Sequence, residues 1–426
     1  MLDIKLLRDS SKAVEENLLR RGDKDKVRLL YDLIRLDSDR RKAIQDVEKL
    51  KHMKNNITKD ISELKSKGKP VKAKLKEVKE LPNRIKKLDG KLSGLDKKCH
   101  SILMTLPNML HESVPQGKDD SDNAELRRWG QQPKFNFTPK GHMEILQQLD
   151  MIDFERAAKV SGAGFYYLKG DAVILDMSLQ RFALDMLRKR GFVVVEPPLM
   201  INRKAYEGMI DVADFEMVTY KIENENLYLI ATAEHPIGSS LMDETLNRTA
   251  LPLKFAGISP CFRKETGTHG KYTKGLFRVH NFNKIEQFVF CQPEESWQLF
   301  EEIQKNAEEL YQALDLHYRV VNICTGDIGS IAAKKYDIEV WMADGKFREA
   351  GSCSNCTDYQ SRRLGIKYRE KEGLPPSGFV HTINNTALAT SRTMIALLEQ
   401  HQKEDGSVEI PKALQHYTGF KTLEKA

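Results

Sequence analysis

The sequence lacks any run of about eighteen apolar residues, so no part of its 426 residues is expected to span a membrane. It begins Met1-Leu-Asp-Ile-Lys, without the apolar core of a secretory signal peptide. Its six cysteines are scattered, and we therefore expect a reduced, cytoplasmic protein. Cys353 and Cys356 form a Cys-x-x-Cys pair, but no second pair or His-x₃-His accompanies them. No structural metal site built from cysteine is therefore expected.

The excess of positive charge is modest for the chain as a whole. Lys and Arg number 68 against 61 Asp and Glu, a formal net charge of +7. The place where this charge gathers therefore matters more than its total. The length predicts two or three domains.

The N-terminal quarter is rich in helix-forming residues. From Lys26 onward apolar residues recur at spacings of three and four or their sums, and they do so again after Ser66-Lys-Gly68-Lys-Pro70. This spacing is typical of a coiled-coil seam, and the turn predicts an antiparallel helical hairpin. Pro82 is expected to kink or break the second helix. The seam residues include Ile44, Val47, Leu50, Ile57, Ile61, Leu64, Leu75, Val78, Leu81, Ile85, Leu88, Leu92, Leu95, Cys99 and Ile102.

The hairpin is also where the positive charge gathers. Between Lys51 and His100 the chain carries sixteen Lys and Arg against six Asp and Glu. A positively charged surface on a long helical hairpin attracts a polyphosphate through counterion release. The alternative is a solvated coiled coil whose lysines only keep it soluble, and this stretch alone favours that alternative.

A segment rich in Pro, Gly and Asp follows the hairpin and places a domain boundary near residue 112. Further on, an amphipathic helix is expected over residues 175–190. The run Phe-Val-Val-Val-Glu-Pro197-Pro198 then predicts a strand that ends at the prolines.

The stretch from Phe262 to Phe288 combines charges, glycines and aromatic rings. Arg263 and Glu265 stand two apart beyond a strand-like run, and such residues share one face of an extended chain. A basic, glycine-containing loop follows, and alternation then places further side chains on one face of a second strand. The loop holds Gly267, Gly270, Lys271, Lys274, Gly275 and Arg278, and the alternating residues are Phe282, Lys284, Glu286 and Phe288.

This hairpin of strands is a candidate nucleotide site. A guanidinium suits a pair of phosphate oxygens and an aromatic face suits a purine, while Glu265 or Glu286 could bind an amine. The alternative is a solvated hairpin with its charges on the wet face, and this stretch alone does not decide between the two.

Thr232-Ala233-Glu234 follows a strand-like run. A buried carboxylate needs a partner, which the ammonium of an amino acid would supply. The alternative is that Thr232 or Glu234 caps the following helix, and the tripeptide alone favours that alternative.

Two later segments also carry polar residues beside strands. Glu349 and Ser352 could hold Mg²⁺ through oxygen, or they could form an ordinary strand end with a capping serine. Arg392 stands in the early turns of a helix, against the preference of the helix dipole. A bound polyphosphate would explain it, and a solvent-facing arginine is the alternative.

Phe262-Arg263-x-Glu265, with Gly-Leu-Phe-Arg278-Val-His-Asn-Phe282-Asn-Lys-Ile-Glu286, closely resembles motif 2 of the seryl-tRNA synthetases, a family of class II aminoacyl-tRNA synthetases. The helix, valine strand and prolines resemble motif 1, and the segment from Thr382 to Arg392 resembles motif 3. Thr-x-Glu and Glu-x-x-Ser match the serine-binding and ATP-binding segments. The resemblance covers essentially the whole chain, in family order.

The resemblance implies an α+β fold. A class II catalytic domain of antiparallel β-sheet flanked by helices would occupy residues 113–426. An N-terminal antiparallel helical hairpin, a coiled coil, would occupy residues 1–112 and bind tRNA through the basic face of residues 26–100, by backbone and shape.

The implied activity is that of a cytoplasmic serine–tRNA ligase. It would activate L-serine with ATP and Mg²⁺, release pyrophosphate, and transfer serine from seryl-adenylate to the 3′-hydroxyl of tRNA(Ser). tRNA(Sec) is a second candidate substrate, and motif 1 implies a homodimer without membrane attachment.

The resemblance assigns residues to each role. The catalytic residues would be Arg263, Glu265 and Arg392. Serine would be bound by Thr232, Ala233, Glu234, Arg263, Glu286, Asn384 and Thr386. ATP would be bound by Arg263, Lys264, Glu265, Arg278, Val279, Phe282, Glu349, Ala350, Gly351, Ser352 and Arg392. Mg²⁺ would be bound with ATP by Glu349 and Ser352.

Two positions depart from the common family pattern. Gly351 stands where many members have serine, which removes a hydroxyl but no backbone contact. Thr386 stands where members commonly have a serine that touches the substrate; it keeps the hydroxyl, and its extra methyl leaves its packing open. These details resemble archaeal or eukaryotic cytosolic members more than bacterial ones.

Two other functions are alternatives on the same fold. A non-catalytic RNA-binding paralogue would be expected to lose Arg263, Glu265 or Arg392, and all three are present. A ligase that loads a small amino acid onto a carrier protein would be expected to lack the basic hairpin, which this chain has. The sequence therefore favours the tRNA ligase.

Overall fold

The computed structural model describes residues 1–211, 215–265 and 275–425. It divides the chain into two compact units at Leu106/Pro107. Within the described ranges, no helix is long and apolar enough to cross a membrane.

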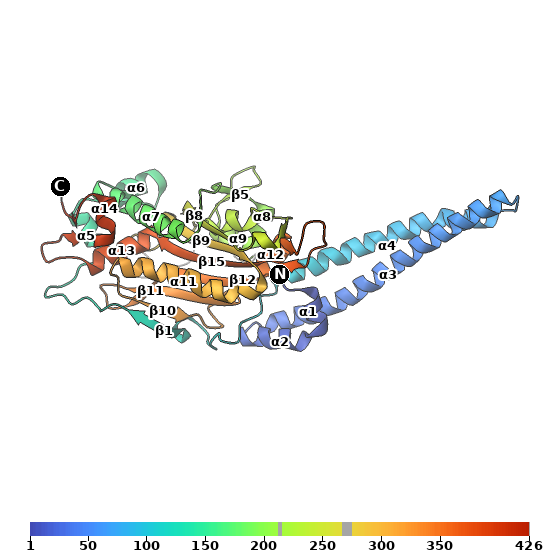
Figure 1. The fold of residues 1–426 in the computed structure, drawn as a ribbon, viewed down its shortest axis with the longest axis horizontal. Helices are drawn as coiled ribbons and strands as arrows, with labels where there is room; N and C mark the ends of the chain where they lie inside the picture. The colour runs from blue at the N-terminus through green and yellow to red at the C-terminus, as the bar shows by residue number, and fades with distance from the viewer. Residues whose placement is uncertain (212–214, 266–274, 426) are drawn as a thin grey trace. The chain divides into compact units, whose positions relative to one another are not determined.

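The N-terminal unit is helical. Its helices are α1 (Ile4–Asp9), α2 (Ser11–Arg20), α3 (Lys24–Ser66) and α4 (Lys72–Thr105). The turn between α3 and α4 contains Gly68 at φ +66°, a conformation that glycine adopts at little cost. Figure 1 shows α3 and α4 side by side along their length, which confirms the predicted helical hairpin. The buried seam between them contains Leu50, Ile57, Ile61 and Leu81.

Helix α4 continues through Pro82, so the alternative of a break there is wrong, while the alternative of a kink stays a prediction. Proline removes one backbone donor, but it does not remove the apolar contacts on either side. Leu81 is buried in the seam, with Val78 and Ile85 packed against the same cluster. Packing of the apolar stripe therefore outweighs the local helix penalty.

The C-terminal unit is built on an eight-stranded sheet in the order β1-β10-β11-β12-β15-β9-β8-β4. All neighbouring strands are antiparallel except β4 and β8 at one edge. In that order the strands are Ala124–Trp129, Tyr318–Asn322, Lys334–Trp341, Phe347–Thr357, His381–Ala389, Asn281–Cys291, Leu253–Phe262 and Val193–Val195. This confirms the predicted α+β class with an antiparallel sheet.

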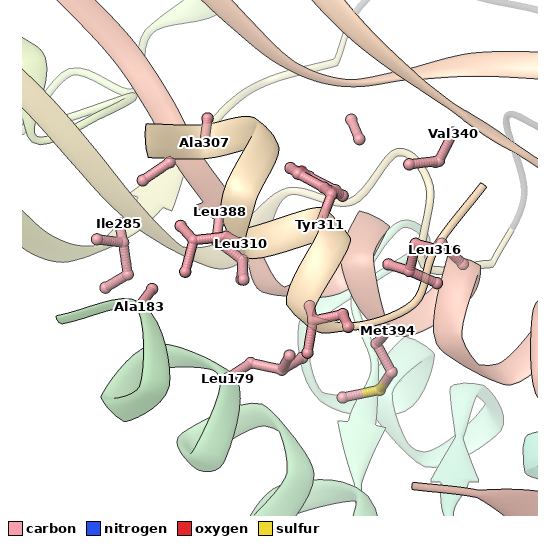
Figure 2. Packing of buried hydrophobic residues seen from close by; sticks show 14 of the residues in the cluster. Leu179, Ala183, Ile285, Ala307, Leu310, Tyr311, Leu316, Val340, Leu388 and Met394 are labelled. Atoms are coloured by element: carbon pink, nitrogen blue, oxygen red, sulfur yellow. The ribbon is translucent and has the colours of Figure 1, made fainter. Parts of the chain in front are cut away.

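Helices α7 (Asp171–Lys189), α11 (Ser296–Ala313) and α13 (Thr390–Gln400) pack on one face of this sheet. Figure 2 shows Leu179 of α7, Leu310 of α11 and Met394 of α13 meeting in one apolar cluster. Ile285 on β9 and Leu388 on β15 belong to the same cluster. Because strand side chains alternate, the neighbours Lys284 and Glu286 lie on the opposite face.

Shorter elements complete this unit and its second apolar layer. The remaining helices are α5 (His142–Gln148), α6 (Phe154–Ser161), α8 (Arg203–Met209), α9 (Phe215–Val218), α10 (Glu234–Ser239), α12 (Tyr359–Leu364) and α14 (Lys412–Thr418). The remaining strands are β2 (Ile152–Asp153), β3 (Tyr167–Leu168), β5 (Met200–Asn202), β6 (Leu227–Leu229), β7 (Thr245–Asn247), β13 (Lys367–Arg369), β14 (Gly378–Phe379), β16 (Val408–Glu409) and β17 (Thr422–Leu423). Residues of α8, α10 and α12 pack with Phe288 and Phe290 of β9 in a separate cluster.

Candidate active site

A cleft of about 440 Å³ lies on the sheet face that carries Lys284 and Glu286. It gathers side chains as far apart in the sequence as Ile210 and Thr386, a separation of 176 residues. The lining comprises Ile210, Asp211, Val218, Ala231, Thr232, Glu234, His235, Arg263, Lys284, Glu286, Lys335, Glu349, Ser352, Ser354, Asn384 and Thr386. Eight of the predicted site residues are among them: Thr232, Glu234, Arg263, Glu286, Glu349, Ser352, Asn384 and Thr386.

Glu286 is the buried carboxylate at the floor of the cleft, with 1% of its surface exposed. The Lys284 ammonium forms an ion pair with its Oε2 atom. Thr232 Oγ1 donates a hydrogen bond to the same oxygen at 3.2 Å, and Thr232 Oγ1 also accepts from the Glu234 backbone N–H at 3.1 Å. The buried charge of Glu286 is therefore compensated within the protein.

Glu234 is the second carboxylate, and it has different partners. Its Oε1 atom accepts hydrogen bonds from Asn384 Nδ2 and Gln360 Nε2, both at 3.1 Å. These amides are neutral donors. Burial, followed by repulsion from Glu286, raises the pKa of Glu234 to about 7, against the opposing attraction of Lys284. An added cation would be stabilised here.

Glu349 and Ser352 both face the cleft, although residues three apart on a regular strand point to opposite faces. The pairing of β11 with β12 shifts by one residue, so Ile338 opposes Gly351 while Glu339 opposes Glu349. This bulge leaves Ala350 out of register and returns both polar side chains to one face. Ser352 Oγ donates to Glu349 Oε1 at 3.3 Å.

Cations surround Glu349. Arg392 Nη1 lies 3.0 Å from its Oε1 atom and donates to its backbone oxygen at 3.1 Å. Partial desolvation opposes the charge of Glu349, whose side chain is 45% exposed, but Arg392, Lys335 and Arg263 together lower its pKa to about 2. Glu349 is therefore a carboxylate across the physiological range. Arg392 also stacks on Phe277, with its Cζ 4.9 Å from the ring centroid.

Arg263 lines the cleft together with its glutamates and lies beside an aromatic ring. Its Nε donates to the Ala231 carbonyl at 3.3 Å, and its Cζ stands 5.2 Å from the Phe282 ring centroid. Its backbone N–H donates to His280 O at 2.9 Å, which ties the end of β8 to the start of β9. The predicted arginine and aromatic ring are thus neighbours at the rim of the cleft.

Glu265 does not line the cleft; it pairs with Arg278, whose Nη1 lies 3.0 Å from Glu265 Oε2. Glu265 adopts φ +47°, a conformation that costs a non-glycine residue energy and that recurs at functional sites. The predicted Gly267, Gly270, Lys271 and Lys274 of the same loop lie outside the described residues.

Several predicted ligands of the substrate contribute no side chain to the cleft. Lys264 lines a separate cavity of about 240 Å³ with Arg203, Thr219, Lys221 and Tyr228. Three other predicted ligands are buried residues with apolar side chains, so only their backbone groups could bind a polar substrate: Ala233, Val279 and Ala350.

Gly351 and Thr386 face each other. A Cβ atom at Gly351 would lie 2.9 Å from Thr386 O, 3.2 Å from its Cβ and 3.3 Å from its Cγ2. The methyl of Thr386 therefore lies against the space that a side chain at position 351 would need. The two departures from the family pattern form one packing unit.

Lys284 and Lys335 line the cleft, although the family resemblance assigned a substrate-binding role to neither. Lys284 is two residues before Glu286, so the alternation that placed them on one face was the available signal. Lys335 stands two residues before Asp337, and its Nζ lies 3.7 Å from Asp337 Oδ1. Burial raises the pKa of Asp337 to about 7, against the attraction of Lys335.

Comparison with known proteins relates this geometry to a family. Residues 218–401 match the family model "tRNA synthetase class II core domain (G, H, P, S and T)", and residues 1–110 match "Seryl-tRNA synthetase N-terminal domain". The chain is 52% identical to a serine–tRNA ligase of Methanocella arvoryzae over 98% of both chains. It is 49% identical to that of Pyrococcus horikoshii, over 99% of this chain and 97% of the relative.

Solved structures give the same relationship. The seryl-tRNA synthetase of Pyrococcus horikoshii complexed with ATP superposes with a TM-score of 0.95 at 48% identity, covering all of both chains. The cytoplasmic serine–tRNA ligase of Naegleria fowleri in complex with AMP gives 0.89 at 32% identity, covering 100% of this chain and 99% of the other. Archaeal and eukaryotic relatives thus agree with the expected variant. The chain belongs to the seryl-tRNA synthetase family.

Proposed function

We propose that this cleft activates L-serine with ATP and that the chain, a serine–tRNA ligase, then transfers serine to tRNA(Ser). The observation that carries this assignment is the single cleft that holds two carboxylates, Glu234 and Glu286, next to Arg263 and the Arg392–Glu349 pair. The part of the cleft with the two carboxylates suits a small zwitterion with a hydroxyl. The part with the arginines suits a polyphosphate.

The serine end is assigned from charge balance. Glu286 already has Lys284 as its counter-ion, whereas the side-chain donors to Glu234 among the described residues are neutral amides. The substrate ammonium therefore binds Glu234, and the substrate hydroxyl bonds with Glu286 and Thr386. Alanine would leave those buried groups unpaired, so rejection by a factor of about 10⁴ is expected. Threonine would be excluded by volume.

The nucleotide end uses the cations and the aromatic plate. Arg263 binds the serine carboxylate and the α-phosphate, Phe282 stacks on adenine, and Arg278 and Arg392 hold the β- and γ-phosphates. Arg278 would exchange its present partner Glu265 for phosphate oxygens. Because substrate binding neutralises Arg392, the Arg392–Glu349 ion pair is also expected to rearrange.

The first step needs no general base, because the serine carboxylate is already ionised. A serine carboxylate oxygen attacks the α-phosphorus in line, the bond to the β-phosphate oxygen breaks, and pyrophosphate leaves. Arg263 stabilises the charge that develops on the α-phosphate, and the cleft supplies orientation. In the second step the 3′-hydroxyl of tRNA attacks the adenylate carbonyl carbon, the bond to the phosphate oxygen breaks, and AMP leaves with its phosphate taking up the hydroxyl proton as the ester forms.

Glu349 and Ser352 fit a magnesium ion that enters with ATP. Both offer oxygen ligands on one face, and Glu349 stays ionised. In the described part of the chain, no three His, Cys, Asp or Glu side chains form a metal site of their own. The remaining ligands would come from phosphate and water, and bound Mg²⁺ would neutralise phosphate charge.

Serine-dependent ATP–pyrophosphate exchange by the purified protein tests the assignment, with alanine, threonine and glycine as controls. Exchange with serine alone is the expected result. Exchange with none of the four, from folded protein with Mg²⁺ present, would instead favour a non-catalytic RNA-binding paralogue. Charging of a carrier protein but no tRNA would favour the small-amino-acid ligase.

We assign the binding of tRNA to the hairpin of α3 and α4. Outside residues 51–100 the chain has 52 Lys and Arg against 55 Asp and Glu, so the whole positive excess lies on that segment. Its lysines are mostly exposed. Such a surface binds a nucleic acid backbone with little base reading. For that reason tRNA(Sec) of similar shape is a second candidate substrate.

Charge reversal tests the hairpin in the full-length protein. The triple variant Lys54→Glu, Lys76→Glu, Lys87→Glu should keep pyrophosphate exchange and raise the KM for tRNA at least tenfold, with a weaker salt dependence. The control reverses three exposed lysines of the catalytic unit, Lys159, Lys371 and Lys412. Equal tRNA KM values for the two variants would refute the assignment. The KM values for transcripts of tRNA(Ser) and tRNA(Sec) should be compared.

A homodimer is supported by one exposed apolar surface at the β4 edge of the sheet. It comprises Val173, Ile174 and Met177 of α7, Val193 and Val194 of β4, and Leu199 and Met200 near β5. Apolar surface on an edge strand usually has a partner. Met177→Asp should therefore produce monomers in sedimentation velocity, whereas Val160→Asp, at an exposed valine of α6, should not.

We also place the reaction in the cytoplasm. The six cysteines are free and buried, which suits a reducing compartment.

A further inference from the structure

We propose that Lys284 is a positioning residue for serine recognition, acting through Glu286 and Thr386. This inference rests on the proposed serine site and gives a role to a residue that lies within motif 2 but is absent from the expected ligand set.

Lys284 is an unusually buried cation, with 5% of its surface exposed. It lies on β9 between Phe282 and Glu286, and its ammonium lines the cleft. A lysine at such a place loses hydration, which only good partners offset. Its ion pair with Glu286 Oε2 supplies one such partner. Glu286 needs the pair equally, because a buried carboxylate without a counter-ion is energetically costly.

The second contact of Lys284 orients Thr386. Lys284 Nζ lies 3.4 Å from Thr386 Oγ1, on the strand directly opposite Glu286. The Thr386 methyl lies on the other side, against the open position at Gly351. The hydroxyl of Thr386 is thus constrained by a hydrogen bond, and its methyl has room because position 351 carries no side chain. Its hydroxyl is thereby held in one direction for a ligand.

Together these contacts give the carboxylates of Glu234 and Glu286 different roles in binding serine. The charged groups that line the cleft are Asp211, Glu234, Arg263, Lys284, Lys335, Glu286 and Glu349. Within the described residues, Glu286 forms an ion pair with Lys284 and Glu349 forms one with Arg392. Lys284 therefore reserves Glu286 and Thr386 as oriented hydrogen-bonding groups for the hydroxyl and leaves Glu234 for the ammonium. Without Lys284, Glu286 would compete for the ammonium and serine would bind in mixed orientations.

Lys284→Met is the direct test, because methionine keeps the apolar stem and removes the charge. Serine KM in pyrophosphate exchange should rise tenfold or more, while ATP KM changes by less than about threefold. The preference for serine over alanine should fall at least tenfold, because the hydroxyl is no longer read by two oriented groups. A merely structural role would lower the melting temperature and affect both KM values alike.

Two further variants keep the test decisive. Lys284→Arg retains the charge with a different shape, so its serine KM should lie between those of the wild type and Lys284→Met. If Lys284→Met fails to fold, a selective rise in serine KM for Lys284→Arg decides in favour. The control Lys334→Met removes another buried lysine, which packs on Phe300 and Tyr336 away from the cleft, and should leave serine KM unchanged.

The outcomes separate this inference from the function on which it rests. Absence of exchange in the wild type would overturn the proposed function. A wild type that activates serine, with a folded Lys284→Met of unchanged serine KM and unchanged serine-to-alanine preference, would overturn the role of Lys284 alone. Equal rises in serine KM for Lys284→Met and Lys284→Arg, without loss of preference for serine, would also overturn it.

Discussion

Gly351→Ala should impair serine recognition through a collision with Thr386. The added Cβ would lie 2.9 Å from the Thr386 carbonyl oxygen, a backbone atom that cannot rotate away. It would also lie 3.2 Å from Thr386 Cβ and 3.3 Å from Cγ2. Overpacking of this kind costs about 1–3 kcal/mol. If about 1.4 kcal/mol of this is relieved by turning Thr386 away from the substrate, serine KM rises about tenfold.

A double-mutant cycle measures that contact. Thr386→Ser removes the methyl but leaves the carbonyl contact, so the double variant should recover part of the loss rather than all of it. The assays are serine KM in pyrophosphate exchange and the melting temperature of each variant. Gly90→Ala is the control: no atom lies within 4 Å of its added Cβ, and a helical alanine should stabilise α4 by about 0.5–1 kcal/mol without changing serine KM. A Gly351→Ala protein with wild-type serine KM and wild-type melting temperature would refute the reasoning.

Three further predictions concern the same cleft. Glu286→Ala should lower kcat/KM for serine at least about a hundredfold, because it removes a hydroxyl acceptor and leaves Lys284 unpaired; wild-type activity would exclude Glu286 from the site. Because burial and Glu286 raise the pKa of Glu234 to about 7, kcat/KM for serine should fall as the pH drops below about 7 and Glu234 takes up a proton. A flat wild-type profile from pH 8 to about 5.5 would contradict this assignment. Glu349→Gln should raise the Mg²⁺ concentration for half-maximal exchange, and an unchanged requirement would remove Glu349 from the metal site.

Local patterns in the sequence predicted the type of most elements. The spacing of apolar residues indicated the hairpin, and Gly68 marked its turn, because coiled-coil periodicity and left-handed turns are properties of short segments. Alternation likewise placed Lys284 and Glu286 on one strand face. Pro82 is the exception: seam packing along α4 outweighed a local penalty that the sequence alone made prominent.

The site was predictable as a set of residue types more than as a geometry. Thr232, Arg263, Glu286 and Thr386 were recognisable because each belongs to a short motif, and the fold gathers them around one cleft. The hydrogen-bond and ion-pair partners of the site residues could not be predicted from the sequence. The carboxylate of Glu265 pairs with Arg278 outside the cleft lining, because the backbone there turns into a left-handed conformation.

The sequence by itself determined the helical hairpin, the strand character of the motifs and the identity of the chemical groups, since each follows from neighbours within a few residues. Tertiary structure alone decided how those groups meet. A one-residue bulge in β12 brings Glu349 and Ser352 to the same face, which a regular strand forbids. Pairing of β9 with β15 places Thr386 opposite Glu286, where its hydroxyl also reaches the Lys284 ammonium. Register and bulges depend on strands distant in the chain, so no local pattern records them.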